Sequence, residues 1–303
     1  MQLLKEMCAI HAPSGNEAAM TEFVLDYVNK NKKSFKHQPE VFSGGLLRDC
    51  VILKFGKPRT AIFAHLDNIG FTVRYGTELV KIGGPKAKSG YKLHGKDSKG
   101  DIVCTLLCDE NGSLRYDFDR EIDRGTNLSF VSDFKETDEL ITSCYMDNRL
   151  GVWSVLKVAE NLEDGLIVFS CYEEVGGGSV SFLGKYMYEN FGVAQALISD
   201  ITWTTEGVKH GGGVAISLRD SGIPRRSYLD KIVALANKSG VKYQLEVESA
   251  GGSDGNVLAA SPYPIDWCFV GAPEDNVHSP IETVNKNDIT AMVEMYNYLM
   301  KNL

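Results

Sequence analysis

The 303-residue sequence lacks several features that would indicate particular classes of protein. No uninterrupted apolar run approaches the ~20 residues that a membrane-spanning helix needs, so we expect no membrane as a partner. Residues 1–13 mix charged with apolar residues and do not have the pattern of a secretory signal peptide. The net charge is −8 and there is no basic stripe, so we expect no nucleic acid as a partner either.

The cysteines also lack a pattern. There are seven, an odd number, and several stand inside apolar segments, as Cys144, Cys171 and Cys268 do. Cys104 and Cys108 are too far apart for a Cys-x-x-Cys motif. Reduced, buried thiols are the simplest account. The sequence therefore predicts no disulfide framework, no thiolate metal site, and a cytoplasmic location.

What the sequence does contain is a buried strand that runs into two adjacent acidic residues. Residues 166–171 are apolar or small without alternation, which is typical of a strand buried on both faces of a parallel sheet. Glu173 and Glu174 follow, and residues 176–178 are three glycines. Two like charges at a buried strand end are unfavourable unless a cation or a shared proton compensates them. Alone, such a pair is more often a solvated acidic turn.

Around this strand, helices and strands alternate along the chain. Strands are predicted near 50–55, 61–64, 194–199, 243–247 and 266–270, and helices near 20–28, 150–159, 179–188, 229–236 and 287–300. Ser14, three residues before Glu17, has the spacing of a capping box for the first long helix. The alternation predicts an α/β fold with a doubly wound, mostly parallel sheet and helices on both faces.

Residues 71–140 differ from the rest because helical periodicity is absent there. Short alternating runs are separated by turn signals, and Asn111-Gly112 predicts a β-hairpin with a type I′ turn. We therefore predict a small all-β domain at 71–140, inserted into a catalytic α/β domain made of residues 1–70 and 141–303.

Residue types that bind metals recur where the predicted strands end. They are His65, Asp67, Asp147, Glu173, Glu174, Asp200 and His278. In a doubly wound sheet the carboxyl ends of the strands meet at one edge, so we expect these side chains to converge. Two histidines with several carboxylates suit Zn²⁺, Co²⁺ or Mn²⁺. Each residue alone also has an ordinary explanation, as a satisfied core histidine or a helix cap.

Taken in order, the motifs resemble those of the dinuclear-metal aminopeptidases. The resemblance is to the branch of glutamyl, leucyl and deblocking aminopeptidases that assemble as tetrahedral (TET) dodecamers, with a zinc-peptidase-like fold. It spans nearly the whole chain, including the inserted β domain. The motifs are His65-Leu-Asp-Asn-Ile-Gly70, Met146-Asp-Asn-Arg-Leu-Gly151, Glu173-Glu-Val-Gly176, Asp200, Gly251-Gly-Ser-Asp-Gly255 and His278-Ser-Pro-Ile-Glu282.

The resemblance implies two divalent metal ions, Zn²⁺ or Co²⁺ with Mn²⁺ as an alternative. His65 and Asp200 would be ligands of one ion, and Glu174 and His278 of the other. Asp147 would bridge both ions. Such a protein would be a metallo-aminopeptidase, which uses hydroxide held by the two metals to remove the first residue of peptides with a free N-terminus.

The resemblance also implies roles for two catalytic residues and an assembly. Glu173 would be the general base, and Asp67 would orient His65. The chain would be a homo-oligomer, although the short inserted domain leaves a dodecamer or a smaller assembly open. Asn68 stands where the family usually has an acid, which leaves its effect on His65 open. We expect residues 201–205 to line the substrate cleft.

Two other functions fit parts of the sequence. Residues 251–255 match the G-x-S-x-G elbow of serine hydrolases, with Ser253 as nucleophile, residues 210–213 match an HGGG oxyanion hole, and His278 would complete the set. That alternative leaves His65, Asp147 and the glutamate pair unexplained. A non-catalytic homologue that serves as an assembly scaffold is the second alternative. A carbohydrate hydrolase is less well supported, because its two carboxylates should face each other from separate places.

Overall fold

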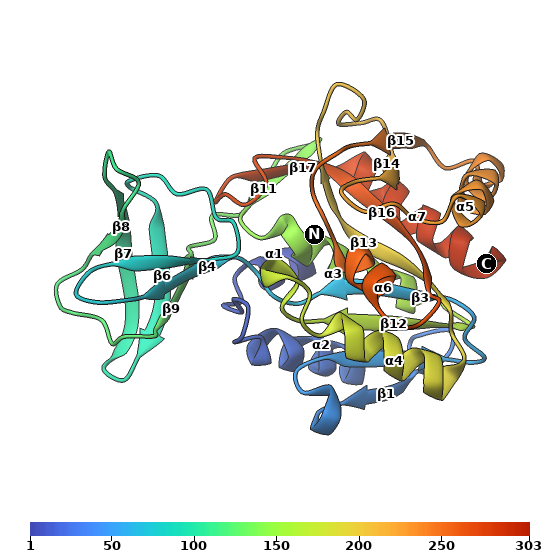
Figure 1. Cartoon of the computed structure of the whole chain (residues 1–303), viewed down its shortest axis with the longest axis horizontal. Coiled ribbons are helices and arrows are strands. Elements are labelled where there is room, and N and C mark those ends of the chain that lie inside the picture. The colour runs from blue at the N-terminus through green and yellow to red at the C-terminus, as the bar shows by residue number, and fades with distance from the viewer.

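The computed structural model describes residues 1–303 and contains two sheets (Figure 1). The larger sheet has 11 strands. Nine of them follow the order β1 (Glu40–Ser43), β2 (Val51–Phe55), β12 (Gly165–Ser170), β3 (Ala61–His65), β13 (Gln195–Trp203), β16 (Asp266–Asp275), β17 (Glu282–Asn285), β11 (Leu140–Ser143) and β10 (Lys135–Glu136). The other two extend from β16: β14 (Val214–Arg219) pairs with it, and β15 (Tyr243–Val247) pairs with β14.

The centre of the larger sheet is parallel and its margins are mostly antiparallel. Strands β12, β3, β13 and β16 run parallel to one another, whereas β1, β2, β14, β17 and β11 pair antiparallel with their neighbours in the main order. Every residue of β12 and β3 is buried, as their unbroken apolar sequences predict. The predicted α/β fold is confirmed, as a mixed sheet with a parallel core.

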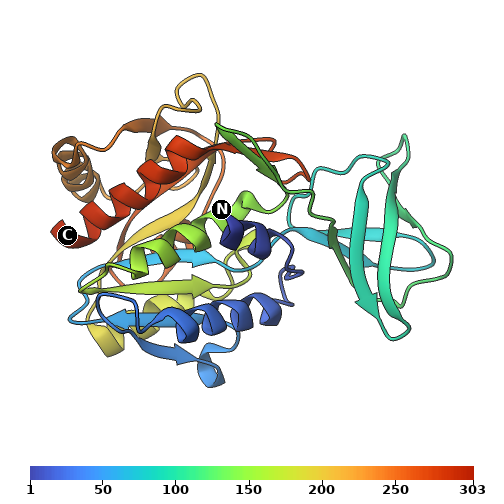
Figure 2. The same cartoon turned by 180° about the vertical axis from the view of Figure 1, so that it is seen from behind.

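Helices cover both faces of this sheet. Helices α3 (Met146–Ala159) and α7 (Lys286–Asn302) lie on one face with α1 (Gln2–Cys8) (Figure 2), and α4 (Val180–Phe191) and α6 (Asp254–Ala260) lie on the other (Figure 1). The remaining helices are α2 (Ala18–Asn31), α5 (Arg226–Ser239) and the 3₁₀ turns η1 (Gly45–Leu47) and η2 (Glu173–Val175). None of the helices combines the length and the apolar character needed to cross a membrane.

The second sheet is antiparallel throughout and stands to one side of the larger body (Figure 1). Its order is β5 (Leu79–Ile82), β4 (Gly70–Val73), β9 (Asn127–Phe130), β6 (Lys92–Asp97), β7 (Gly100–Cys108) and β8 (Leu114–Asp117). It has its own core of 14 buried residues, separate from the core of 64 in the larger body. Strand β10, within the predicted insertion, pairs with the larger sheet. The division into domains at 70 and 141 stays a prediction.

Two local predictions are wrong in detail. The hairpin between β7 and β8 exists, but Cys108 pairs with Leu114, so residues 109–113 form a longer loop than a two-residue type I′ turn. The Asp109 carboxylate stabilises that loop by accepting from the amides of Asn111 and Ser113. The predicted capping box is absent as well, because neither Ser14 nor Glu17 makes a side-chain bond to the start of α2.

Candidate metal centre

The predicted site residues converge at one edge of the large sheet. His65 ends β3, the glutamate pair lies in η2 directly after β12, and His278 follows β16. Asp200 lies within β13 rather than at its end, because β13 continues to pair with β16 as far as Trp203. Ile198 pairs with Phe63, so the same register continued by two residues brings Asp200 level with His65.

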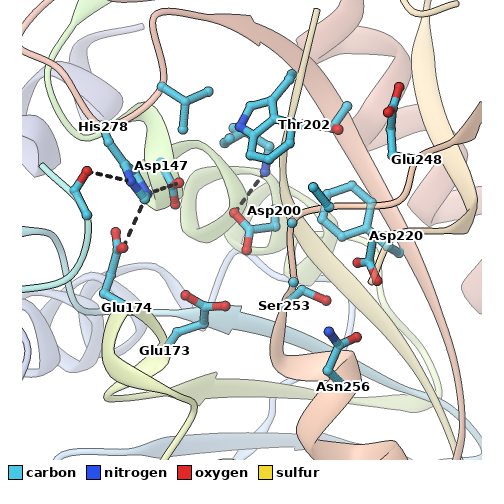
Figure 3. Close-up of a pocket in the computed structure, with 18 of the residues that line it drawn as sticks. Asp147, Glu173, Glu174, Asp200, Thr202, Asp220, Glu248, Ser253, Asn256 and His278 are labelled. Atoms are coloured by element: carbon cyan, nitrogen blue, oxygen red, sulfur yellow. Dashed lines mark hydrogen bonds and ion pairs between the residues drawn. The ribbon is translucent and has the colours of Figure 1, made fainter. Parts of the chain in front are cut away.

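Asp147 occupies the centre of the group (Figure 3). It lies at a kink near the start of α3, where its backbone and that of Asn148 leave the helical conformation and the peptide bond between them is cis. One carboxylate oxygen, Oδ1, is 3.1 Å from His65 Nε2, and the other, Oδ2, is 3.2 Å from His278 Nε2. The two oxygens of one carboxylate thus face two different imidazoles.

The remaining ligand candidates divide between the two histidines. Asp200 Oδ2 lies 3.6 Å from His65 Nε2, and Glu174 Oε2 lies 3.2 Å from His278 Nε2. The ligand atoms of His65, Asp147 and Glu174 all lie within 4.8 Å of one another. Glu173 is less closely held, since its Oε2 is 3.9 Å from His65 Nε2.

The donor set fits divalent cations. Four carboxylates meet here, and no lysine or arginine forms an ion pair with any of them. Glu174 Oε1 is buried and has no hydrogen-bond partner. Buried carboxylates are costly unless a cation compensates them, and mixed imidazole and carboxylate donors suit Zn²⁺, Co²⁺ or Mn²⁺. The imidazole and carboxylate side chains that meet here are therefore suited to hold the divalent metal ions that the sequence led us to expect.

The protonation of the site follows from the same crowding. Burial raises the pKa values of Glu173 and Asp200 well above the ordinary range, and nearby carboxylates add to the rise. Burial alone would lower the pKa of His278, but its bonds to Asp147 and Glu174 raise that pKa to about 11. These shifts follow from the close packing of carboxylates around the imidazole.

Asp67 connects His65 to the glutamate turn. Its Oδ1 lies 3.5 Å from His65 Nδ1, and the same nitrogen is 3.1 Å from the carbonyl oxygen of Asp67. The carboxylate also accepts from the amides of Glu173 (3.1 Å) and Glu174 (3.2 Å) and from the Ser14 hydroxyl (2.6 Å). Asp67 therefore fixes the imidazole and the turn together.

Asn68 faces away from the histidine. Its Oδ1 accepts from Arg149 Nη2 (2.8 Å) and from the amide of Ala12 (3.2 Å), and its Nδ2 donates to the carbonyl of Ile69 (2.7 Å). The amide thus joins buried Arg149 to the segment after α1 and makes no hydrogen bond with the side chains of the ligand candidates.

Two supporting groups had no role in the sequence analysis. Glu282 is fully buried and accepts from the amides of Asp147 (3.3 Å) and His278 (2.8 Å), so it joins the backbones of two ligand candidates. The carbonyl oxygen of Gly84 lies 3.2 Å from His278 Nδ1. Glu282 stood in a quoted motif, four residues after His278, whereas nothing in the sequence indicates Gly84.

The residues proposed for a serine hydrolase are engaged elsewhere. Ser253 caps α6, where its hydroxyl accepts from the amide of Gly255. The amides of Gly211 and Gly213, which would form the oxyanion hole, donate to the Asp288 carboxylate. His278 contacts Asp147 and Glu174. The three parts of that alternative are therefore not assembled.

A cavity of about 520 Å³ opens beside the ligand candidates. Asp147, Glu173, Glu174, Asp200 and His278 line one side of it, and Figure 3 shows their side chains gathered there. Of the segment expected to line a cleft, Ile201, Thr202 and Trp203 do so. The ligand candidates thus face a space large enough for a substrate.

Comparison with known proteins agrees with this geometry. The chain is 25% identical over 327 aligned positions to a protein of Acetivibrio thermocellus named as a candidate aminopeptidase, covering 97% of this chain and 96% of that one. The structure of an aminopeptidase from Desulfurococcus kamchatkensis matches with a TM-score of 0.87 at 21% identity, over 100% of this chain and 94% of that one.

The TET1 peptidase of Pyrococcus horikoshii, which can assemble into a tetrahedron or a large octahedral shell, matches with a TM-score of 0.82 at 21% identity, over 98% of each chain. These likenesses at low identity show that the fold is shared. A family model described as M42 glutamyl aminopeptidase matches residues 94–295. The chain therefore belongs to the M42 glutamyl aminopeptidase family.

Proposed function

We propose that this M42 aminopeptidase removes the first residue of peptides with a free N-terminus by means of two divalent metal ions, Zn²⁺ or Co²⁺, and Glu173. The observation that carries the proposal is the position of Asp147, whose two oxygens face His65 and His278 separately. His65 and Asp200 would hold one ion, Glu174 and His278 the other, and Asp147 both. When bound, such a pair of ions polarises the scissile carbonyl and lowers the pKa of water.

Glu173 is the residue best placed to move a proton. Both glutamates line the cavity, but Glu174 is held by His278, whereas the side chain of Glu173 makes no hydrogen bond. The Asp67 carboxylate fixes the backbone amide of Glu173 and so sets where its side chain starts. Glu173 would take a proton from the attacking water and return it to the leaving amine.

The test is Glu173→Gln, because glutamine keeps the shape and loses the proton-transfer group. Metal content, measured by elemental analysis, is expected to equal that of the wild type, while kcat for an aminoacyl-anilide falls by ~10²–10⁴-fold. Glu206→Gln, on an exposed loop outside the cavity, is the matched control. Near-normal turnover by Glu173→Gln would remove the glutamate from this role.

The same preparations separate the two alternatives. A serine hydrolase would be labelled stoichiometrically at Ser253 by a fluorophosphonate and would stay active in a strong chelator. A non-catalytic scaffold would hydrolyse no aminoacyl-anilide with any added metal. For the metallo-aminopeptidase we expect activity that is lost with the chelator and restored by Zn²⁺ or Co²⁺.

Assembly is a further part of the proposal. We expect a homo-oligomer in solution, since the similar TET1 peptidase forms closed shells and this chain covers 98% of it. Light scattering coupled to gel filtration would show whether the assembly is a dodecamer or smaller, and a monomer would contradict it.

A further inference from the structure

The cavity has a second acidic wall across from the ligand candidates. Asp220 follows β14, Glu246 lies in β15 and Glu248 comes directly after that strand, so two paired strands bring the three carboxylates together. In Figure 3, Asp220 and Glu248 lie on one side of the pocket, and Asp147, Glu174 and His278 lie on the other. None of the three is a ligand candidate.

Two of these carboxylates, those of Asp220 and Glu246, are buried, and they have no cation of their own. Glu246 is 4% exposed and Asp220 8% exposed, yet both line the cavity. One oxygen of Glu246 accepts from the Thr202 hydroxyl, and Asp220 Oδ1 accepts from the amide of Gly222 (2.6 Å). No lysine, arginine or histidine of the chain forms an ion pair with either of them.

Arg219 compensates this wall only in part. Its Nε donates to the carbonyl oxygen of Asp220 (3.2 Å) and it forms no ion pair with a carboxylate. Burial raises the pKa values of Glu246 and Asp220, and for Asp220 this outweighs the opposite effect of the Arg219 charge. A buried carboxylate without a counter-ion is unfavourable in the free protein, so a cation that enters from solution gains a partner there.

The lining of the cavity is also partly apolar. Ile201, Trp203, Val257 and Phe269 also line the cavity. A lysine or arginine side chain has an aliphatic stem and a cationic end, which matches apolar walls that lead to buried carboxylates. A glutamate side chain would meet like charge there, and a leucine would leave the carboxylates without a partner.

We propose that Asp220, Glu246 and Glu248 form the subsite for the side chain of the substrate's first residue and select lysine or arginine. The proposal rests on the proposed function, because it places the amino group and the scissile bond of that residue at the metal centre. Lys86, which is exposed and lies near Gly84, is the one lysine or arginine that lines the cavity, and it would instead favour an acidic side chain. The experiment therefore compares basic, neutral and acidic residues.

The first measurement is kcat/KM for the p-nitroanilides of lysine, arginine, norleucine, leucine and glutamate. Norleucine matches the stem of lysine and lacks its charge. We expect lysine to exceed norleucine by roughly 10- to 100-fold, the value of one or two charged hydrogen bonds. Glu246→Gln should reduce this lysine-to-norleucine ratio by at least about tenfold. The exposed control Glu206→Gln should leave it unchanged.

Because Glu246 is buried, Asp220→Asn and Glu248→Gln provide the same test if Glu246→Gln does not fold. A wild-type preference for leucine or glutamate over lysine and arginine would overturn the proposal and leave the peptidase function intact. So would a lysine-to-norleucine ratio that stays the same in every folded variant.

A second measurement separates this proposal from the function on which it rests. Calorimetry follows the binding of lysinamide and norleucinamide to the wild type and to the folded variants. Tighter binding of lysinamide that is lost in the variants, with no hydrolysis of any anilide, would support the subsite and overturn the peptidase function. Equal binding of the two amides, with no hydrolysis, would overturn both.

Discussion

The two halves of the proposed metal centre are supported by different parts of the molecule. His65 and Asp200 lie on neighbouring parallel strands of the large sheet, and the His65 side chain is 1% exposed. His278 and Glu174 lie in connections after strands, and the His278 side chain is 29% exposed. One half is therefore positioned by the register of the sheet and the other by loops.

The loop-held half also depends on the second sheet. Residues 83–86 leave that sheet after β5, and here the Gly84 carbonyl lies against His278 Nδ1 while the Lys86 amide donates to the His278 carbonyl (2.8 Å). A side chain at Gly83 would lie 3.1 Å from the carbonyl oxygen of Glu174. Backbone groups next to the second sheet thus bond to His278, in the loop-held half of the proposed centre. The same segment makes no such bond to His65 or Asp200.

The largest expected effect comes from the residue that both halves share. Asp147→Ala removes one oxygen from each half, so we expect both ions to be lost and activity to fall to background. Elemental analysis and an anilide assay on the same sample check this. Asp138→Ala, at an exposed residue without a side-chain partner, is the control. Retention of one ion at full occupancy would show that the halves bind independently of Asp147.

Gly84→Ala would separate the halves. A Cβ at this position would lie 3.0 Å from His278 Nδ1, so the ring or the segment must shift. We expect affinity for the ion at His278 and Glu174 to fall by ~10- to 100-fold, as for loss of a group that orients a ligand, while the ion at His65 and Asp200 stays. A metal titration with two resolved steps measures this.

The control for that change is Gly207→Ala. Gly207 is exposed, its backbone is outside the left-handed region, and the nearest atom to its added Cβ is 4.0 Å away. The Gly207→Ala variant should bind both ions with wild-type affinity. If Gly84→Ala weakened both steps equally, the second sheet would support the whole centre rather than one half.

The site residues that the sequence predicted best are those that the strands of the large sheet position. His65 and the glutamate pair follow unbroken apolar segments, and strand ends that share an edge must lie close together. Gly84 could not be predicted, because it contributes a carbonyl group that every residue has. Glu282 was missed for a related reason, since it contacts two backbone amides rather than a ligand side chain.

The capping motif shows why local patterns can mislead. Ser14 and Glu17 have the spacing of a capping box, but the Ser14 hydroxyl donates to Asp67, and Glu17 Oε1 accepts from the amides of Gly15 (2.9 Å) and Tyr172 (3.3 Å). Asp67 and Tyr172 adjoin the glutamate turn, far away in the sequence. The spacing of a capping box considers only partners close in the sequence. Here the Ser14 hydroxyl bonds instead to Asp67, which the fold brings beside it. The two residues thus support the site that the rest of the sequence had indicated.

The smallest effect is expected inside the second sheet, where a charge pair contacts no site residue. Asp97 accepts two bonds from Arg120 and one each from the amides of Lys99 and Asp123, and the Arg120 guanidinium holds the pKa of Asp97 below its usual range. A pKa that is lower in the folded state stabilises the fold above the unfolded value of about 4 and ceases to do so as the pH falls through the folded value.

Asp97→Asn should therefore lower the melting temperature at pH 7, and the difference from wild type should shrink as the pH falls below about 4. Metal content should stay at the wild-type level, because neither Asp97 nor Arg120 makes a hydrogen bond or an ion pair with a ligand candidate. Asp101→Asn, which removes an exposed charge from the same sheet, should leave the melting temperature unchanged. If Asp97→Asn lost the ion at His278, the second sheet would support that half through its folding as a whole, and the role given to Gly84 would extend to the entire sheet.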